Sequence, residues 1–325
     1  MSEWSLTSTP PHDWYLCLDV SSYFDFEHEP ENMFETGFTR PVPIGDQDTA
    51  LTIRFNGDPE SPEFFFSCKK SLSHVEIECA NQHLTKILGL KMDLRKLYDR
   101  AANDPVLGPK LSEYYGLKRM TRATLFEDIQ NRIVEMQMNH KPTAKKMMYR
   151  IREQYGSLLD HDGGTIAAWP RPHELMKADP HNIRALGPTL RKGQYLTGLA
   201  QDIVAGTTDI HWLTTCDPLT AYNTLVKIKG IGPTAAQDLI MMRGRTDAVF
   251  PSNKKKNQEK GLRRWIIWSY GEDPDATTED RFQELTQAWK GCESAALEFL
   301  YLNYIMKEKE QRQKKILITT KDVHD

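Results

Sequence analysis

Two glycines in a short connection between apolar segments are the residues whose spacing most clearly indicates chemistry. The pattern of LVKIKGIGPTAAQDLIMMRG at 225–244 predicts two helices joined by Lys229-Gly230-Ile231-Gly232-Pro233. Glycine adopts backbone angles that other residues resist, and it leaves the amides at the start of the second helix uncovered. These amides and the positive end of the helix dipole can hold a DNA phosphate, directly or through a bound cation. Such a contact positions a protein on DNA without reading the base sequence.

A polar position follows the hairpin at a fixed distance, because Pro251-Ser252-Asn253 ends 19 residues after Thr234. With this spacing the chain resembles the helix-hairpin-helix DNA glycosylase superfamily, in which the last position is an aspartate. The closest resemblance in the sequence is to the bacterial 3-methyladenine DNA glycosylase II family. Its successive landmarks occur here in the same order: PPHDWYLCL, IVEMQMNHKPTAKKM, WPRPHELMKADP, ALGPTLRKGQYLTGLA, IKGIGPTAAQDLIMMRG and WKGCESAALEFLYL.

The resemblance implies an α+β fold and a base-excision activity. An N-terminal α/β domain would pack on two helical lobes, and a monomer would bend duplex DNA and flip a damaged base into the cleft between the lobes. Water would then replace an alkylated (3-methyladenine-like) or deaminated purine at the sugar. No cofactor is expected for the chemistry. A non-catalytic damaged-DNA-binding protein and an 8-oxoguanine-type glycosylase remain alternatives.

Three groups of residues would contact DNA by this resemblance. The hairpin at Lys229, Gly230, Ile231 and Gly232 would hold a phosphate, and the backbone carbonyls of Lys229 and Ile231 could bind a monovalent cation that bridges to it. Met138, beside Gln137, would fill the gap that the flipped base leaves. Alternatively, Met138 completes the core at a helix end. The run that begins with Lys254 and Lys255 would add phosphate contacts, unless it is an ordinary solvated surface.

Three further residues are expected at the base pocket. Thr234 occupies the position of the lysine that forms a Schiff base in bifunctional relatives, and its hydroxyl cannot form an imine, so lyase activity is not expected. Asp238 lies one helical turn later on the same face, where it would meet the base or, alternatively, pair with a Lys or Arg. Tyr301 falls where relatives place an aromatic wall, although core packing explains it equally well.

Asn253 is the expected catalytic position, but its amide lacks the charge and basicity that a carboxylate would bring to an oxocarbenium-like transition state. It could be an engineered change from aspartate, a natural loss of catalysis, or a misregistration. In the last case Glu259 is the alternative acid, because GLRR at 261–264 resembles the helix that often begins at the aspartate in relatives.

The elements that must position these residues fall into two regions. Alternation in ALTIRFNGD, EFFFSC and HVEIECA predicts an antiparallel sheet in an N-terminal domain at 1–105. From MDLRKLYDRAA onward the period is helical, apart from loops, and it predicts two helical lobes at 106–310. The helix-hairpin-helix lies at 222–243 in this region. The charged tail at 311–325 has no core-facing period and is expected to be disordered.

Composition adds limits on the class of protein. The net charge of the 325 residues is −3, but residues 118–265 contain 24 Lys and Arg against 14 Asp and Glu, a balance of +10 that favours a DNA-facing surface. The five cysteines form no CxxC pair, which argues against a zinc site or a disulfide framework. Neither a membrane-spanning run nor a secretory signal is visible, so a cytoplasmic (nucleoid) setting is expected, or a nuclear one in a eukaryote.

Overall fold

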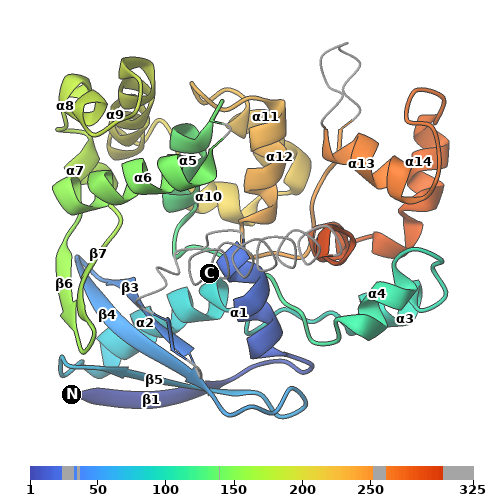
Figure 1. Cartoon of the computed structure of the whole chain (residues 1–325), viewed down its shortest axis with the longest axis horizontal. Coiled ribbons are helices and arrows are strands. Elements are labelled where there is room, and N and C mark those ends of the chain that lie inside the picture. The colour runs from blue at the N-terminus through green and yellow to red at the C-terminus, as the bar shows by residue number, and fades with distance from the viewer. Residues whose placement is uncertain (24–32, 35–36, 139, 252–260, 303–325) are drawn as a thin grey trace, which may run out of the picture.

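The computed structural model (Figure 1) describes residues 1–23, 33–34, 37–138, 140–251 and 261–302. Its N-terminal part is built on a five-stranded antiparallel sheet in the order β1-β5-β4-β3-β2. The side chains of Phe64 and Phe66 face the core, whereas Phe65 between them is exposed, as the predicted alternation requires. The strands are β1 Ser2–Thr7, β2 Met33–Phe34, β3 Gly37–Ile44, β4 Gln47–Phe55 and β5 Glu63–Cys68.

The segment HVEIECA, predicted to be a strand, is helical instead and belongs to α2 (His74–Ile87). Ser73 caps this helix: its hydroxyl accepts a hydrogen bond from the Glu76 amide, and the Glu76 carboxylate accepts one from the Ser73 amide. This capping box fixes a helix start, and Ala80, Leu84 and Ile87 then form the buried face at helical spacing. The predicted strand was wrong because the capping box stabilises a helix start at Ser73, and alternation over a few residues is a weaker determinant of structure.

The rest of the described chain is mainly helical, as predicted, and the helices between residues 125 and 241 lie above the sheet in Figure 1. Most of these helices begin at a Ser, Thr or Asp cap or at a proline in the first turn. The helices are α1 Trp14–Tyr23, α3 Arg95–Ala101, α4 Gly108–Glu113, α5 Leu125–Glu135, α6 Lys141–Tyr155, α7 Pro172–Leu175, α8 Pro180–Ala185, α9 Leu190–Val204, α10 Ile210–Thr215, α11 Pro218–Leu225, α12 Pro233–Met241, α13 Leu262–Ser269, α14 Glu279–Leu285 and the 3-10 helix Gln287–Trp289. Residues 293–302 are also helical.

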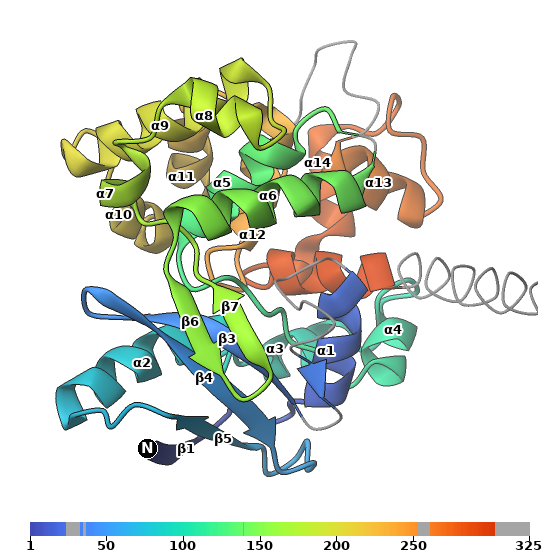
Figure 2. The ribbon, with the colours of Figure 1, turned by 60° about the vertical axis from the view of Figure 1, so that its left-hand side comes forward.

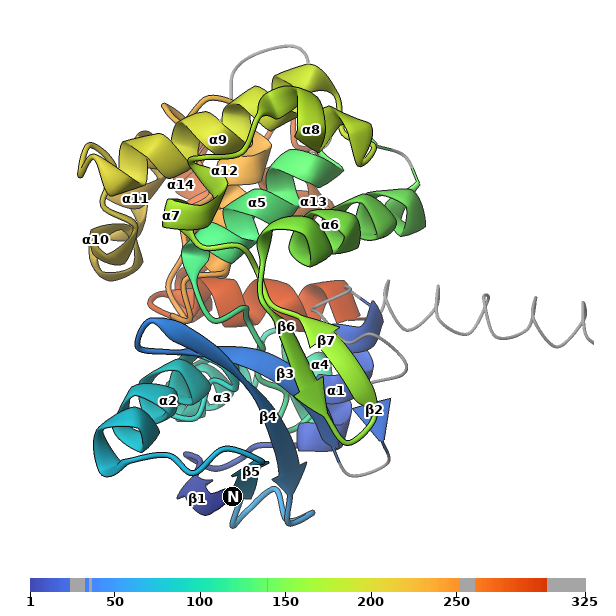
Figure 3. The ribbon, with the colours of Figure 1, turned by 90° about the vertical axis from the view of Figure 1, so that its left-hand side faces the viewer.

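A second, two-stranded sheet interrupts the region that was predicted to contain only helices and loops. Strands β6 (Leu158–His161) and β7 (Gly164–Ala167) pair antiparallel around the Gly163-Gly164 turn. Figures 2 and 3 show this hairpin reaching from the helices across β3 and β4, and residues of β6 and β7 contact those strands. The hairpin therefore connects the helical region to the N-terminal sheet.

The sheet and the helices share one connected hydrophobic core, which extends from Trp14 to Leu302. The α+β fold class is confirmed, while the domain boundary at 105/106 stays a prediction. All five cysteines are free thiols, and burial raises the pKa of Cys17, Cys68 and Cys292. Within the described part of the chain, no helix is both long enough and apolar enough to cross a membrane.

Candidate nucleic-acid interface and active site

The predicted hairpin joins α11 to α12 and is open at its second glycine. Gly230 has φ of +94°, and a Cβ atom there would lie 2.5 Å from the Tyr195 ring, so only glycine fits without rearrangement. Gly232 is the N-cap of α12 with an ordinary φ of −89°, and a Cβ atom there would meet nothing within 4 Å. The first helical hydrogen bond runs from the Ala236 amide to the Gly232 carbonyl, so the Thr234 and Ala235 amides before it have no carbonyl partner within the helix. The hairpin thus presents uncovered backbone amides and a helix N-terminus to the outside.

The hairpin glycines line a groove of about 490 Å³ together with two other turns. The turn between α5 and α6 contributes Met136–Met138, and the turn before α9 contributes Gly187–Thr189. Gln137 and Met138, predicted from separate motifs to contact DNA, therefore lie on the same groove as Gly230–Gly232. The structure brings the hairpin and the predicted wedge together.

Gln137 has a left-handed backbone conformation with φ of +58°, and it is exposed. A non-glycine residue in this region is uncommon and stores strain, which is found most often at functional sites. The turn is held by a hydrogen bond of 3.0 Å from the Met138 amide to the Glu135 carbonyl. Met138 itself is half-buried and packs against the core. Met138 therefore both lines the groove and contacts the core, so neither of the two interpretations given for it from the sequence is excluded.

Three residues at the start of α9 also line this groove and were not predicted as site residues: Arg191, Lys192 and Tyr195. The Arg191 guanidinium lies 5.5 Å from the centre of the Tyr195 ring, and that ring packs against Gly230. The Lys192 ammonium donates a hydrogen bond of 2.7 Å to the Val134 carbonyl at the end of α5, and burial lowers the pKa of Lys192. The sequence contains a signal for this site, because Arg191 and Lys192 lie in the first turn of α9, where positive charge is unfavourable beside the positive end of the helix dipole. A nearby anion such as a phosphate would remove this conflict.

The expected pocket residues Thr234 and Asp238 lie on α12, beyond the hairpin. Thr234 is exposed. Asp238 forms an ion pair with Arg132 of α5, which is the pairing that the sequence left open as an alternative to a base contact. Burial raises the pKa of Asp238, while the Arg132 and Arg119 guanidiniums oppose the rise. The Asp238 charge is thus largely balanced within the protein.

A second ion pair lies near the first and is more deeply buried. The Arg119 guanidinium lies 2.6 Å from a carboxylate oxygen of Glu298, and the two side chains are only 6% and 4% exposed. Burial raises the pKa of Glu298, and Arg119 opposes the rise. We call Arg119, Arg132, Asp238 and Glu298 the inter-helix ion cluster, because they come from the loop before α5, from α5, from α12 and from helix 293–302. The sequence analysis did not predict this cluster.

Tyr301 forms an aromatic stack with Trp265 of α13, with ring centres 4.1 Å apart and planes at 2°. Both rings are partly buried and pack against the core. The two aromatic side chains form one continuous wall, and their spacing leaves no room for a base between them. Tyr301 therefore offers at most an outer face, and Trp265 is a wall residue that the sequence analysis did not single out.

The predicted catalytic positions Asn253 and Glu259, with Lys254 and Lys255, lie outside the described residues. The chain is described up to Pro251 and again from Gly261, where α13 begins as the GLRR motif predicts. Glu259 lies three positions before Leu262, the first residue of α13, and Asn253 lies nine positions before it. Both alternatives for the catalytic acid therefore stay open. No group of three or more metal-ligating side chains occurs among the residues that the structure describes.

No family model matches the chain, but individual proteins do. A DNA-3-methyladenine glycosylase of Bacillus subtilis is 22% identical over 265 residues, which cover 81% of this chain and 84% of that protein. DNA-3-methyladenine glycosylase 2 of Escherichia coli is 25% identical over 261 residues, covering 76% of this chain and 83% of that protein.

Two solved structures share the fold along almost the entire chain. The 3-methyladenine DNA glycosylase of Archaeoglobus fulgidus superposes with a TM-score of 0.71 at 20% identity, covering 92% of this chain and 97% of that one. The 8-oxoguanine glycosylase/lyase of Clostridium acetobutylicum, in complex with double-stranded DNA, gives 0.66 at 14% identity, covering 95% and 99%. The resemblance inferred from the ordered motifs is confirmed: the chain is similar in sequence to DNA-3-methyladenine glycosylases and has the fold of helix-hairpin-helix DNA glycosylases.

Proposed function

We propose that this chain is a DNA N-glycosylase of base excision repair that acts as a monomer on alkylated or deaminated purines in duplex DNA. The groove carries the proposal, because it gathers the hairpin glycines, the Gln137-Met138 turn and the basic start of α9 on one surface. The similarity in sequence to 3-methyladenine glycosylases supports the substrate class. We place its action in the bacterial cytoplasm (nucleoid), or in the nucleus if the source is eukaryotic.

Each part of the groove has a role in this proposal. The amides after Gly232 hold a phosphate, and a monovalent cation at the Lys229 and Ile231 carbonyls could bridge to it. Met138 enters the stack where the damaged base leaves it, and an unbranched thioether suits a gap of irregular shape. Thr234 has no amine, so the reaction is hydrolysis at the anomeric carbon and not formation of a Schiff base. The products are the free base and an abasic site.

The identity of the catalytic residue, with Asn253 as the first candidate, determines how fast this reaction proceeds. A carboxylate there would stabilise the positive sugar in the transition state and would orient or deprotonate water. The Asn253 amide can orient water but carries no charge, so we propose a protein that holds a flipped base better than it releases it. If Glu259 is the acid, the chain is instead a fully competent glycosylase.

Base release from a panel of lesions tests the proposal. The substrates are methylated genomic DNA, a duplex with hypoxanthine and a duplex with 8-oxoguanine, and chromatography identifies the freed base. The proteins are the unsubstituted chain, Asn253→Asp, Glu259→Gln and the double variant. We expect Asn253→Asp to release alkylated or deaminated purines faster than the unsubstituted chain. Glu259→Gln should leave the rates of the unsubstituted chain and of Asn253→Asp unchanged.

Other outcomes identify the alternatives. If the unsubstituted chain is fully active and Glu259→Gln abolishes release, Glu259 is the acid and the assignment of Asn253 is wrong. Release of 8-oxoguanine alone would move the substrate class to oxidised purines. If Asn253→Asp binds damaged duplex but frees no base from any substrate, the enzyme hypothesis is lost, and a non-catalytic damage-binding protein is the better description.

A further inference from the structure

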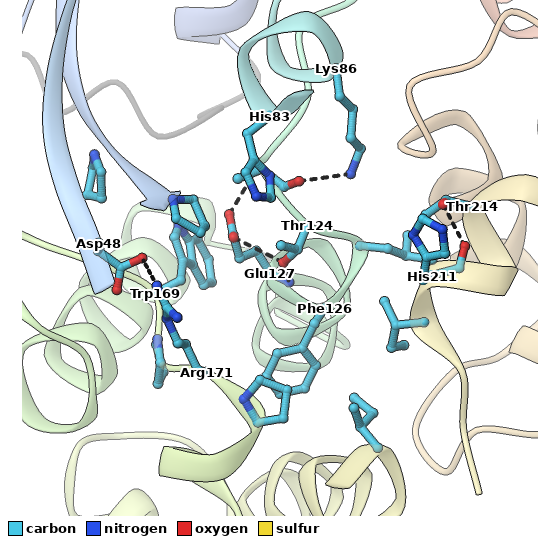
Figure 4. Close-up of a pocket in the computed structure, with 18 of the residues that line it drawn as sticks. Asp48, His83, Lys86, Thr124, Phe126, Glu127, Trp169, Arg171, His211 and Thr214 are labelled. Carbon is cyan, nitrogen blue, oxygen red and sulfur yellow. Dashed lines mark hydrogen bonds and ion pairs between the residues drawn. The ribbon is translucent and has the colours of Figure 1, made fainter. Parts of the chain in front are cut away.

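We call the groove lined by Gly230–Gly232 the DNA-facing groove. A second cavity lies at the opposite ends of two helices that border this groove. It has a volume of about 600 Å³ and is enclosed by β3 and α2 of the N-terminal part and by α5, α9 and α10 of the helical part (Figure 4). Helix α5 contributes its first residues to this cavity, and the turn that follows its last residue, Met136–Met138, lines the groove. Helix α9 reaches the cavity with Ile203 and the groove with Arg191 and Tyr195. The two sites are therefore separated by the length of these helices.

Apolar groups make up most of the cavity wall. Proline rings come from β3 and from the loop before α7, and aromatic rings come from α5 and the same loop. The principal apolar lining residues are Pro41, Pro43, Phe126, Trp169, Pro170 and Ile210. Ligand sites in proteins commonly have volumes of about 300 to 1,000 Å³ and such apolar walls with a few polar groups.

The charged side chains of the cavity, Asp48, Lys86, Glu127 and Arg171, each have partners within the protein. The Lys86 ammonium donates a hydrogen bond of 3.4 Å to the Ala123 carbonyl, and the nearby Asp128 and Glu127 carboxylates attract its charge. Arg171 lies 3.1 Å from the Asp48 carboxylate and donates a hydrogen bond of 2.8 Å to the Gly45 carbonyl. The Glu127 carboxylate accepts hydrogen bonds from the Ala123 amide and the Thr124 hydroxyl, at 3.2 and 3.0 Å. A charged ligand would lose its hydration on entering the cavity and would find no unpaired opposite charge there, so its burial would cost free energy.

The His83 imidazole is an uncharged hydrogen-bonding group on the wall. Burial lowers the pKa of His83, a hydrogen bond with the Ala123 backbone opposes the fall, and the charges of Lys86 and Arg171 lower it further, so the imidazole is neutral at neutral pH. Because its N–H donates to the Ala123 backbone, the other ring nitrogen is left as a hydrogen-bond acceptor. The Trp169 indole nitrogen is buried, and no hydrogen-bond partner for it occurs among the described residues. The Trp169 ring is held between the Arg122 and Arg152 guanidiniums, each 5.1 Å from its centre. The indole nitrogen is therefore closed off from solvent, and Trp169 contributes its ring to the apolar wall.

We propose that this cavity is a binding site for a small, uncharged aromatic molecule that can form hydrogen bonds, with one or two fused rings. Such a ring system fits within the cavity, packs against the prolines and aromatic side chains, and can form a hydrogen bond with the His83 imidazole. This site is independent of the DNA-facing groove and of the acid that carries out base excision.

Three probes with the same ring test the charge preference: indole, indole-3-acetate and tryptamine. Binding to the full chain is measured at neutral pH by calorimetry and by saturation-transfer NMR. Thr214→Phe and Ile210→Trp place bulk into the cavity from α10. Thr215→Phe is the matched control, because both threonine hydroxyls donate to the carbonyl three residues earlier, but only Thr214 lines the cavity.

We expect indole to bind saturably to the natural sequence and to Thr215→Phe, and to lose at least about tenfold in affinity in Thr214→Phe and in Ile210→Trp. Both charged analogues should bind at least about tenfold more weakly than indole. The proposal is overturned if indole binds the two cavity-filling variants as it binds Thr215→Phe, if a charged analogue equals indole, or if no probe saturates. Circular dichroism and the midpoint of thermal unfolding verify that each variant is folded.

Discussion

The hairpin at Lys229–Pro233 leads directly into α12, and the inter-helix ion cluster includes Asp238 of the same helix. The two differ in the kind of groups on which they are built. The hairpin is one contiguous segment whose function depends on missing side chains and exposed amides. The cluster is assembled from four segments, and its function depends on long charged side chains held away from water. Under the proposed function, α12 therefore separates two tasks: its first turn holds a DNA phosphate, and its second turn carries an ion pair that joins it to α5.

The largest expected effect comes from removing a cation of the cluster. Arg119→Met leaves Glu298 buried without its counterion, and breaking such a pair costs about 3 to 5 kcal/mol of the free energy of unfolding. Burial already raises the pKa of Glu298. A carboxyl group whose pKa is higher in the folded state contributes stability at low pH that is lost as the pH rises through that pKa. The deficit of the variant should therefore be larger at about pH 8 than at about pH 5.

Urea unfolding at the two pH values measures this deficit. The control is Arg281→Met, since Arg281 pairs with Glu272 and Glu284 on the surface and its loss should leave the free energy of unfolding nearly unchanged. DNA affinity of the folded Arg119→Met protein should match the natural sequence. A deficit that grows toward acid pH, or a loss as small as that of the control, would contradict the assignment of the cluster to stability.

The same comparison explains what the sequence could reveal. A glycine turn between two helices leaves a local pattern, and the hairpin was located by residue number from that pattern alone. The cluster leaves none, because Arg132 and Asp238 are separated by 106 positions and each is an ordinary helix charge in its own segment. Charge pairs between distant helices depend on packing, which periodicity does not specify.

The fold shows the same limit at two other places. The pattern Ser73-x-x-Glu76 is the sequence signature of a capping box, whereas alternation in HVEIECA predicts a strand where α2 lies. The cavity beside His83 could not be predicted, because β3, α2, α5 and α10 contribute its wall from segments far apart in the chain. Local signals thus predicted most of the elements and the glycine turn between α11 and α12, whereas surfaces between elements required the structure.

An intermediate effect is expected at the hairpin, on DNA affinity instead of stability. In Gly232→Ala the added methyl meets no protein atom within 4 Å, and alanine readily adopts the φ of −89°. As an N-cap, alanine is slightly poorer than glycine, so the free energy of unfolding should fall by less than about 1 kcal/mol. The methyl would, however, occupy the space through which a phosphate approaches the amides. We expect duplex affinity to fall about tenfold, or about 1.4 kcal/mol.

Fluorescence anisotropy with a labelled duplex measures this affinity. Gly198→Ala in α9 is the matched control, because its methyl also meets nothing within 4 Å and it does not line the groove. Unchanged affinity in Gly232→Ala would remove the hairpin from the DNA interface. Gly230→Ala sharpens the contrast, since a φ of +94° and the Tyr195 ring at 2.5 Å should make it lose stability as well as affinity.

The smallest expected effect separates charge from backbone within the hairpin. Lys229 is exposed beside the two glycines, and a lysine that neutralises one phosphate contributes about 0.9 to the slope of log affinity against log salt concentration. Lys229→Met should therefore reduce that slope by about one and weaken binding equally for all duplex sequences, because phosphate contacts carry no sequence information. Lys177→Met, at an exposed lysine after α7 and outside the residues that line the groove, should leave the slope unchanged.

Gly232→Ala should lower affinity at every salt concentration without changing the slope, because it removes no cation. If Lys229→Met and Gly232→Ala change the slope alike, the lysine and the amides do not act separately on a phosphate, and the hairpin would have to be treated as a single electrostatic unit.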